Sequence, residues 1–304
     1  KKINKKTYEI LNFIAIVHRN KGNHKEAINF CKESLKSNEC YAPALSELGY
    51  NYRAIGENEL AIKEYTKLLN IESTNVDALD ELAYNYERLK KWDEAIEFYN
   101  KSKEVEGKDF NDVYSDIHLA NCYSQKGDLE HAEILINKQK IVEHADNYSF
   151  RIRGEIYKKM EKYDEAIKNF ENEAAHVSSP RNFIWFELGY CYGEIDELSV
   201  SLEYYKKYVE LEDLTGAAAQ NIGWVLSALG REEEAIKNYE KGLEENPGHF
   251  GILDNKSISH ENLGQYEDAI KCLDTILEDT PDRVDTFYKK CKLLVKVGKI
   301  TEGI

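Results

Sequence analysis

His118 and Cys122, whose side chains can bind metals or act in catalysis, lie four positions apart. On a helix this spacing places an imidazole and a thiol on one face, as half of a metal site or as a nucleophile beside its base. Cys122 also precedes Tyr123, which belongs to a recurring set of large side chains, so a buried structural thiol is the favoured interpretation. The other cysteines and histidines lack the spacing of zinc ligands.

The sequence contains no motif of a known catalytic or cofactor site. The nucleophile elbow, the phosphate-binding loop, the dinucleotide-binding glycine motif, the zinc-protease motif and the calcium-binding loop are all absent. We therefore predict no catalytic residue, no cofactor, no metal site and no small-molecule substrate, and we expect that the chain is not an enzyme.

Composition narrows the class of partner and the compartment. Acidic residues number 56 against 41 basic ones, which gives a net charge of −15 and disfavours a nucleic acid as partner. No apolar run is long enough to span a bilayer, so we expect no membrane association. The scattered cysteines fit a reducing compartment, and we predict a cytoplasmic protein.

One stretch of the sequence recurs along the chain. "ELGYNYRAIGENELAIKEY", which begins at Glu47, returns as "ELAYNYERLKKWDEAIEFY" 34 residues later and again as "ELGYCYGEIDELSVSLEYY" from Glu187. Two columns of small residues follow this register. The first is Ala15, Gly49, Ala83, Ala120, Gly154, Gly189, Gly223, Ser257 and Cys291; the second is Ala27, Ala61, Ala95, Ala132, Ala166, Ser201, Ala235, Ala269 and Gly303. A fixed period of this size indicates stacked repeats.

The two columns have a physical explanation. Antiparallel helices approach closely only where neither presents a bulky side chain, so the columns predict the crossing of two helices within each repeat. Large residues such as Leu48, Tyr52 and Tyr65 surround each crossing at helical spacing. A glycine at a fixed place, such as Gly22 or Gly56, predicts a helix end in the left-handed conformation. Each repeat is therefore predicted to be a helix, a tight turn and a second helix.

These columns resemble the tetratricopeptide repeat, whose Leu-Gly pair, Tyr, Ala and aromatic positions they follow. The resemblance implies an all-α fold, a right-handed α-α superhelix formed by a single solenoid over residues 1–304. The predicted repeats span residues 8–41, 42–75, 76–112, 113–146, 147–181, 182–215, 216–249 and 250–283, with a partial ninth over 284–304. The chain lacks an initiator Met and stops within a predicted helix, so we expect it to be an excerpt of a longer protein.

In this family the first helices line a concave groove that typically holds an extended peptide or a partner helix. The register places aromatic, Arg and Asn side chains there, which are residue types that supply binding hot spots. The predicted groove residues are Tyr50, Arg53, Tyr84, Asn121, Arg151, Phe186, Tyr190 and Trp224. Asn121 is included because members of the family use Asn to hold a peptide backbone. The alternative is that the rings only pack against the neighbouring repeat.

We therefore predict a non-catalytic scaffold that binds a peptide or protein segment in the groove. The net negative charge favours a basic or neutral partner. The family's clamp for chaperone tails uses a Lys and an Asn one turn apart, and Asn12 with Ile16 does not reproduce it. An alternative function is the regulatory or sensor arm of a larger enzyme or effector, such as a protease, glycosyltransferase or transcription regulator, with its active domain outside this chain.

Overall fold

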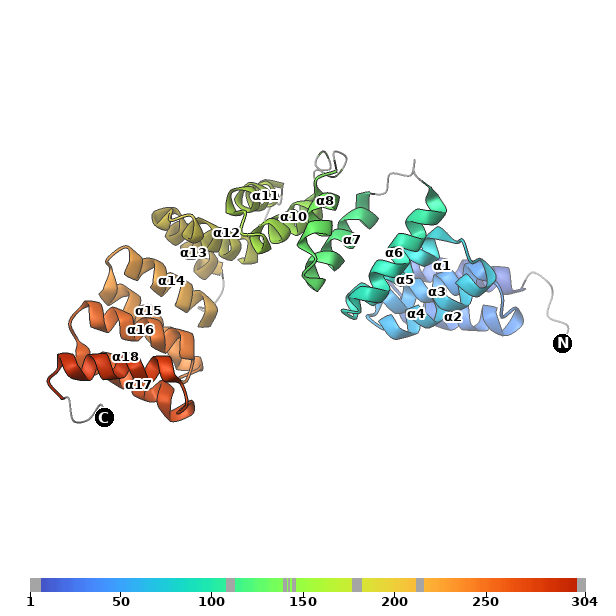
Figure 1. The fold of residues 1–304 in the computed structure, drawn as a ribbon. Coiled ribbons are helices and arrows are strands. Elements are labelled where there is room, and N and C mark those ends of the chain that lie inside the picture. The colour runs from blue at the N-terminus through green and yellow to red at the C-terminus, as the bar shows by residue number, and fades with distance from the viewer. Residues whose placement is uncertain are drawn as a thin grey trace. The chain divides into compact units, whose positions relative to one another are not determined.

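The computed structural model describes residues 7–107, 113–138, 141, 143, 146–176, 182–211 and 216–299. Within these ranges the regular structure consists of α-helices, with no strand (Figure 1). Backbone contacts divide the chain into two units, which we call unit 1 (Lys1–Ala145) and unit 2 (Asp146–Ile304). The fold is therefore all-α, and each unit is a stack of helix pairs.

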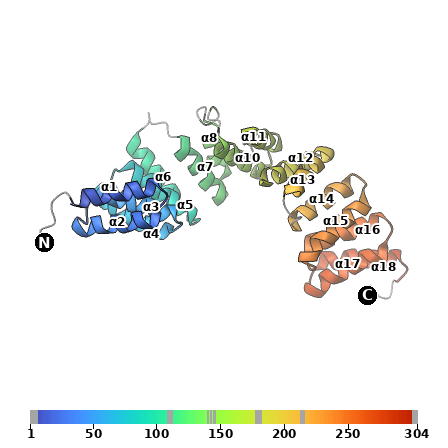
Figure 2. The same cartoon turned by 180° about the vertical axis from the view of Figure 1, so that it is seen from behind.

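The described residues of unit 1 form four pairs of helices joined by tight turns (Figures 1 and 2). The pairs are α1 (Thr7–Asn20) with α2 (His24–Ser37), α3 (Ala42–Ala54) with α4 (Asn58–Ile71), α5 (Val76–Arg88) with α6 (Trp92–Glu106), and α7 (Val113–Lys126) with α8 (Leu129–Ile136). Each pair packs against the next one along the chain. The first helix of every pair begins within one residue of the start that the sequence register predicts.

Unit 2 continues the same arrangement. Its pairs are α10 (Asn147–Lys159) with α11 (Tyr163–His176), α12 (Asn182–Glu194) with α13 (Leu198–Leu211), α14 (Gly216–Ala228) with α15 (Glu232–Glu245), and α16 (Phe250–Asn262) with α17 (Tyr266–Asp279); α18 (Val284–Lys296) follows. Gly303, the last member of the second small column, lies outside the described residues. A single solenoid over the whole chain stays a prediction.

The small columns do mark the helix crossings. A Cβ atom added to Gly49 would lie 2.8 Å from the ring of Tyr65 in the second helix of the same repeat. At Gly223 the same atom would lie 2.2 Å from the ring of Tyr239. Ser201 departs from the Ala column, and its hydroxyl donates to the carbonyl of Gly189 at 2.6 Å, which satisfies its polar group inside the crossing.

The turns also follow the register. Gly22, Gly56, Gly127, Gly230, Gly264 and Gly298 all have φ between 72° and 86°, as predicted. Three repeats place another residue there. Lys90, Glu161 and Asp196 adopt φ of 58°, 58° and 65° at the equivalent position. The conformation of the turn is thus constant even where the glycine is not.

Candidate partner-binding groove

The eight predicted groove residues all lie on first helices, four in each unit. Unit 1 carries Tyr50 and Arg53 on α3, Tyr84 on α5 and Asn121 on α7; unit 2 carries Arg151 on α10, Phe186 and Tyr190 on α12, and Trp224 on α14. We describe the two sets separately. One groove that contains both sets stays a prediction.

A cation from one repeat and a carboxylate and ring from the next recur along unit 1. Arg19 Nη1 lies 2.8 Å from Glu47 Oε2, and its guanidinium carbon lies 5.1 Å from the ring centre of Tyr50. One repeat later, Arg53 Nε lies 3.0 Å from Glu81 Oε2 and its guanidinium carbon lies 5.2 Å from the ring centre of Tyr84. Both rings therefore contact the neighbouring repeat through cation–π geometry.

The third junction of unit 1 places a carboxylate where the first two have an arginine. Glu87 is 8% exposed and accepts hydrogen bonds from Asn121 Nδ2 at 2.8 Å and the Tyr99 hydroxyl at 3.0 Å. His118 Nδ1 lies 2.8 Å from the same carboxylate. The amide of Asn121 is therefore engaged within the chain. This contact competes with its predicted role of holding a peptide backbone.

The surroundings of His118 and Cys122 favour a structural role for both residues. The thiol of Cys122 is fully buried, and burial raises its pKa far above the ordinary value. Burial likewise raises the pKa of the Cys31 and Cys191 thiols to about 12, so these groups are protonated and poorly nucleophilic at neutral pH. Across the described residues, no three His, Cys, Asp or Glu side chains are grouped closely enough to hold a metal ion.

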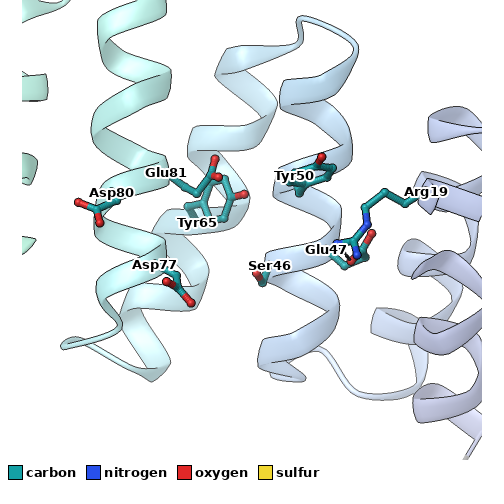
Figure 3. A pocket seen from close by; sticks show the side chains of 8 residues that line it. All are labelled: Arg19, Ser46, Glu47, Tyr50, Tyr65, Asp77, Asp80 and Glu81. Carbon is teal, nitrogen blue, oxygen red and sulfur yellow. Dashed lines mark hydrogen bonds and ion pairs between the residues drawn. The ribbon is translucent and has the colours of Figure 1, made fainter. Parts of the chain in front are cut away.

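A pocket opens between α3 and α5 in unit 1 (Figure 3). Its volume is about 290 Å³, and we call it the acidic pocket. The lining residues are Arg19, Ser46, Glu47, Tyr50, Tyr65, Asp77, Asp80 and Glu81. Four carboxylates and one guanidinium thus line the pocket, so acidic groups outnumber basic ones in its lining.

Glu81 is a carboxylate of the acidic pocket whose pKa is shifted. Its hydrogen-bond partner is the hydroxyl of Tyr65, which is 2% exposed. Burial raises the pKa of Glu81 above its ordinary value, the positive charge of Arg53 opposes this rise, and the neighbouring carboxylates of Asp80 and Asp77 add to it. The ionised form of Glu81 is therefore less favourable here than in water, mainly because the side chain is buried.

A second pocket of about 320 Å³ lies next to the acidic pocket, and Tyr50 lines both. We call it the basic pocket, because Arg53 and Arg88 line it without any carboxylate. Tyr84 supplies an aromatic wall. Two neighbouring pockets of opposite charge thus share the ring of Tyr50.

In unit 2 the predicted residues differ in exposure and contacts. Lys158 pairs with Glu187, and its Nζ lies 5.8 Å from the ring centre of Tyr190, so this junction matches those of unit 1. Trp224 is 44% exposed and lies over Gly193, where a Cβ atom would approach the indole ring to 3.3 Å. Phe186 instead packs edge-on against the rings of Tyr205 and Tyr208 at 5.7 and 5.5 Å, as part of the core.

Comparison with known families identifies these helix pairs. Family models described as tetratricopeptide repeat match residues 8–39, 42–75, 77–104, 152–172 and 226–291. The chain belongs to the tetratricopeptide repeat (TPR) family.

Solved TPR folds agree with this assignment. A TPR protein from Parabacteroides merdae superposes with a TM-score of 0.59 at 18% identity, over 84% of this chain and 99% of the other. A Cut9–Hcn1 complex gives a TM-score of 0.62 at 14% identity, over 81% of this chain and 48% of the other.

Sequence relatives include other TPR proteins. Outer dynein arm-docking complex subunit 4 of Xenopus laevis is 30% identical over 158 residues, which cover 49% of this chain and 28% of that protein. A TPR repeat-containing protein of Methanocaldococcus jannaschii is 24% identical over 99% of this chain and 56% of its own length. A photosystem I assembly protein of Prochlorococcus marinus is 30% identical over 30% of this chain and 55% of that protein. The chain thus spans between about a quarter and little more than half of these relatives.

The carboxylates that line the acidic pocket are not among the residues predicted from the sequence. Glu47 and Glu81 stand at the start of the recurring stretch, each directly before a packing leucine (Leu48 and Leu82). The available signal is their spacing from a cation, because Arg19 precedes Glu47 and Arg53 precedes Glu81 by 28 residues in a repeat of 34.

Among the helices that the structure describes, none combines the length and the apolar character needed to cross a bilayer.

Proposed function

We propose that this TPR protein is a non-catalytic scaffold that binds a basic segment of another protein in the groove of unit 1. TPR proteins are protein-interaction scaffolds, and the acidic pocket supports the choice of partner. A lysine or arginine side chain is the complementary occupant. It is long enough to enter a pocket of about 290 Å³ and can pair with Asp77, Asp80 and Glu81.

The surroundings of the acidic pocket suit a peptide in an extended conformation. The basic pocket next to it offers Arg53 and Arg88 to a carbonyl oxygen or an acidic side chain of the same peptide. Tyr50 lies between the two pockets and contributes apolar area with a polar hydroxyl. In unit 2, Tyr190 and the half-exposed Trp224 are the residues that we propose as further anchors.

The test uses a synthetic peptide array in which lysine or arginine replaces neutral residues position by position. We expect the chain to retain peptides with a basic residue inside an otherwise neutral, extended sequence. The triple variant Asp77→Asn, Asp80→Asn and Glu81→Gln should weaken binding of the retained peptides at least about tenfold, since it removes the charged partners of the bound cation. Binding is measured by fluorescence polarisation, and folding by far-ultraviolet circular dichroism.

The matched control removes the same number of charges elsewhere on unit 1. Glu26, Glu59 and Glu94 are exposed residues of the second helices, and Glu→Gln at all three changes the net charge equally. This control should keep the affinity within about twofold. Equal weakening by the two triple variants would show that net charge alone attracts the peptides. Retention of neutral peptides only, unaffected by either variant, would contradict the proposal.

A further inference from the structure

The seam between α3 and α5, along which the acidic and the basic pocket open, changes its charge from one end to the other. Four residues of α5 that line these pockets follow one another at spacings of four, three and four, which places them on one face of the helix: Asp77, Glu81, Tyr84 and Arg88. Figure 3 shows Asp77 and Glu81 on the side of α5 that faces Tyr50 of α3. Carboxylates thus lie at the start of the seam, tyrosine rings at its middle and a guanidinium at its end.

The charged groups at the two ends of this seam are only partly paired with each other. Arg53 Nε lies 3.0 Å from Glu81 Oε2. Asp77 and Arg88 are exposed, and within the part of the chain that the structure describes neither side chain has a hydrogen bond or an ion pair. A carboxylate at one end and a guanidinium at the other are therefore available to the charges of a bound segment.

The distance between the two ends of the seam selects one spacing in an extended segment. The midpoint of Asp77 and Glu81 lies nine residues before Arg88 on α5, which corresponds to about 13 Å along the helix axis. An extended chain rises about 3.3 Å per residue and returns a side chain to the same face at every second residue. A spacing of two residues therefore spans about 7 Å, and a spacing of four spans about 13 Å. A spacing of three places the second side chain on the opposite face.

We propose that the bound segment carries a basic and an acidic residue four positions apart and lies extended along this seam. The basic residue is the one that the proposed function places in the acidic pocket, on which this inference rests. Its charged group lies between Asp77 and Glu81, and the carboxylate of the acidic residue pairs with Arg88 in the basic pocket. The side chain midway between the two, on the same face, lies over the rings of Tyr50 and Tyr84 and is apolar.

Synthetic peptides with one lysine and one glutamate in a neutral background test the spacing. Three of them place the glutamate two, three or four positions from the lysine, and a lysine-only peptide carries glutamine instead. Fluorescence polarisation measures each dissociation constant. The spacing of four should bind at least about threefold more tightly than the lysine-only peptide, because it adds an ion pair in the basic pocket. The spacings of two and three should bind no more tightly than the lysine-only peptide.

A variant of the chain identifies the group that binds the peptide carboxylate. Arg88→Gln should bring the dissociation constants of the lysine-only peptide and of the peptide with the spacing of four to a ratio of about one, because it removes one partner of the ion pair. Lys63→Gln is the matched control, since it removes the same charge from an exposed residue of α4 that lines neither pocket. It should leave the ratio unchanged.

The outcomes separate this inference from the proposed function. Equal affinities at the three spacings overturn the inference, and so does a ratio that Arg88→Gln leaves unchanged. The lysine-only peptide tests the proposed function by itself, because its affinity should fall in the triple variant Asp77→Asn, Asp80→Asn and Glu81→Gln whether or not the spacing matters. A chain that retains no lysine peptide contradicts both.

Discussion

At the scale of the residue, Glu81 has contacts within the chain and is also proposed to bind the partner directly. It lies beside Arg53, shares a hydrogen bond with Tyr65 and lines the acidic pocket together with Asp77 and Asp80 of the same helix. Burial raises its pKa, so the ionised form is less favourable in the free protein than in water. A bound lysine or arginine would favour that ionised form.

The pH dependence of binding follows from this shift. A ligand that prefers the carboxylate lowers its pKa and releases a proton, so affinity rises with pH while the Glu81 carboxyl of the free protein is still ionising. The rise begins at the lower pKa that Glu81 has in the complex and levels off above its raised pKa in the free protein. Fluorescence polarisation of a retained lysine peptide across this pH range measures the effect. Glu81→Gln should flatten the profile, and an unchanged profile in that variant would assign the proton to another group.

At the scale of the helix pair, packing depends on the complementary sizes of two residues that lie sixteen positions apart in the sequence. Glycine in the first small column faces an aromatic ring in the second helix, as Gly154 faces Phe170 and Gly223 faces Tyr239. Where the column holds Ala or Ser, the residue sixteen positions later is smaller in three of four repeats. These pairs are Ala15 with Cys31, Ala120 with Ile136 and Ser257 with Leu273. Total volume at the crossing is thus roughly conserved.

This complementarity of size predicts that a second substitution can restore part of the stability that a first one removes. Gly223→Ala should destabilise unit 2 by about 1–3 kcal/mol, because its Cβ atom would lie 2.2 Å from the Tyr239 ring. Adding Tyr239→Leu should recover part of that loss, since the double variant resembles the pair of Ser257 with Leu273. Urea unfolding followed by circular dichroism measures both. Gly248→Ala is the control, because its Cβ atom has nothing nearer than 3.9 Å, and strictly additive effects of the first two changes would contradict the match.

The helix pairs were predictable from the sequence because their causes are local. Period, helix starts and the left-handed turn each depend on residues within one repeat, and all three agree with the structure. The groove contacts depend on side chains from two repeats. Phe186 shares its column with Arg151, yet it packs against Tyr205 and Tyr208, which only the three-dimensional neighbours decide. The acidic pocket likewise forms from α1, α3, α4 and α5 together.

At the scale of the whole chain, the net charge of −15 acts on any basic partner before contact. The field of many dispersed carboxylates acts over about 10 Å at 0.1 M salt and is progressively screened as salt increases. The acidic pocket acts only after docking, through a few direct contacts. The two contributions should therefore affect different rate constants of the same binding reaction.

Stopped-flow measurement of the binding of a retained lysine peptide should separate the contribution of the net charge from that of the acidic pocket. Raising the ionic strength should lower the association rate constant by about tenfold or more, while the dissociation rate constant changes much less, because screening weakens the long-range attraction. The triple variant Asp77→Asn, Asp80→Asn and Glu81→Gln should instead raise the dissociation rate constant, since the contacts it removes exist only in the complex. The Glu26, Glu59 and Glu94 control should lower the association rate constant slightly and leave dissociation unchanged. A dissociation rate constant that is equal in all three proteins would remove the acidic pocket from the binding site and leave only the diffuse charge.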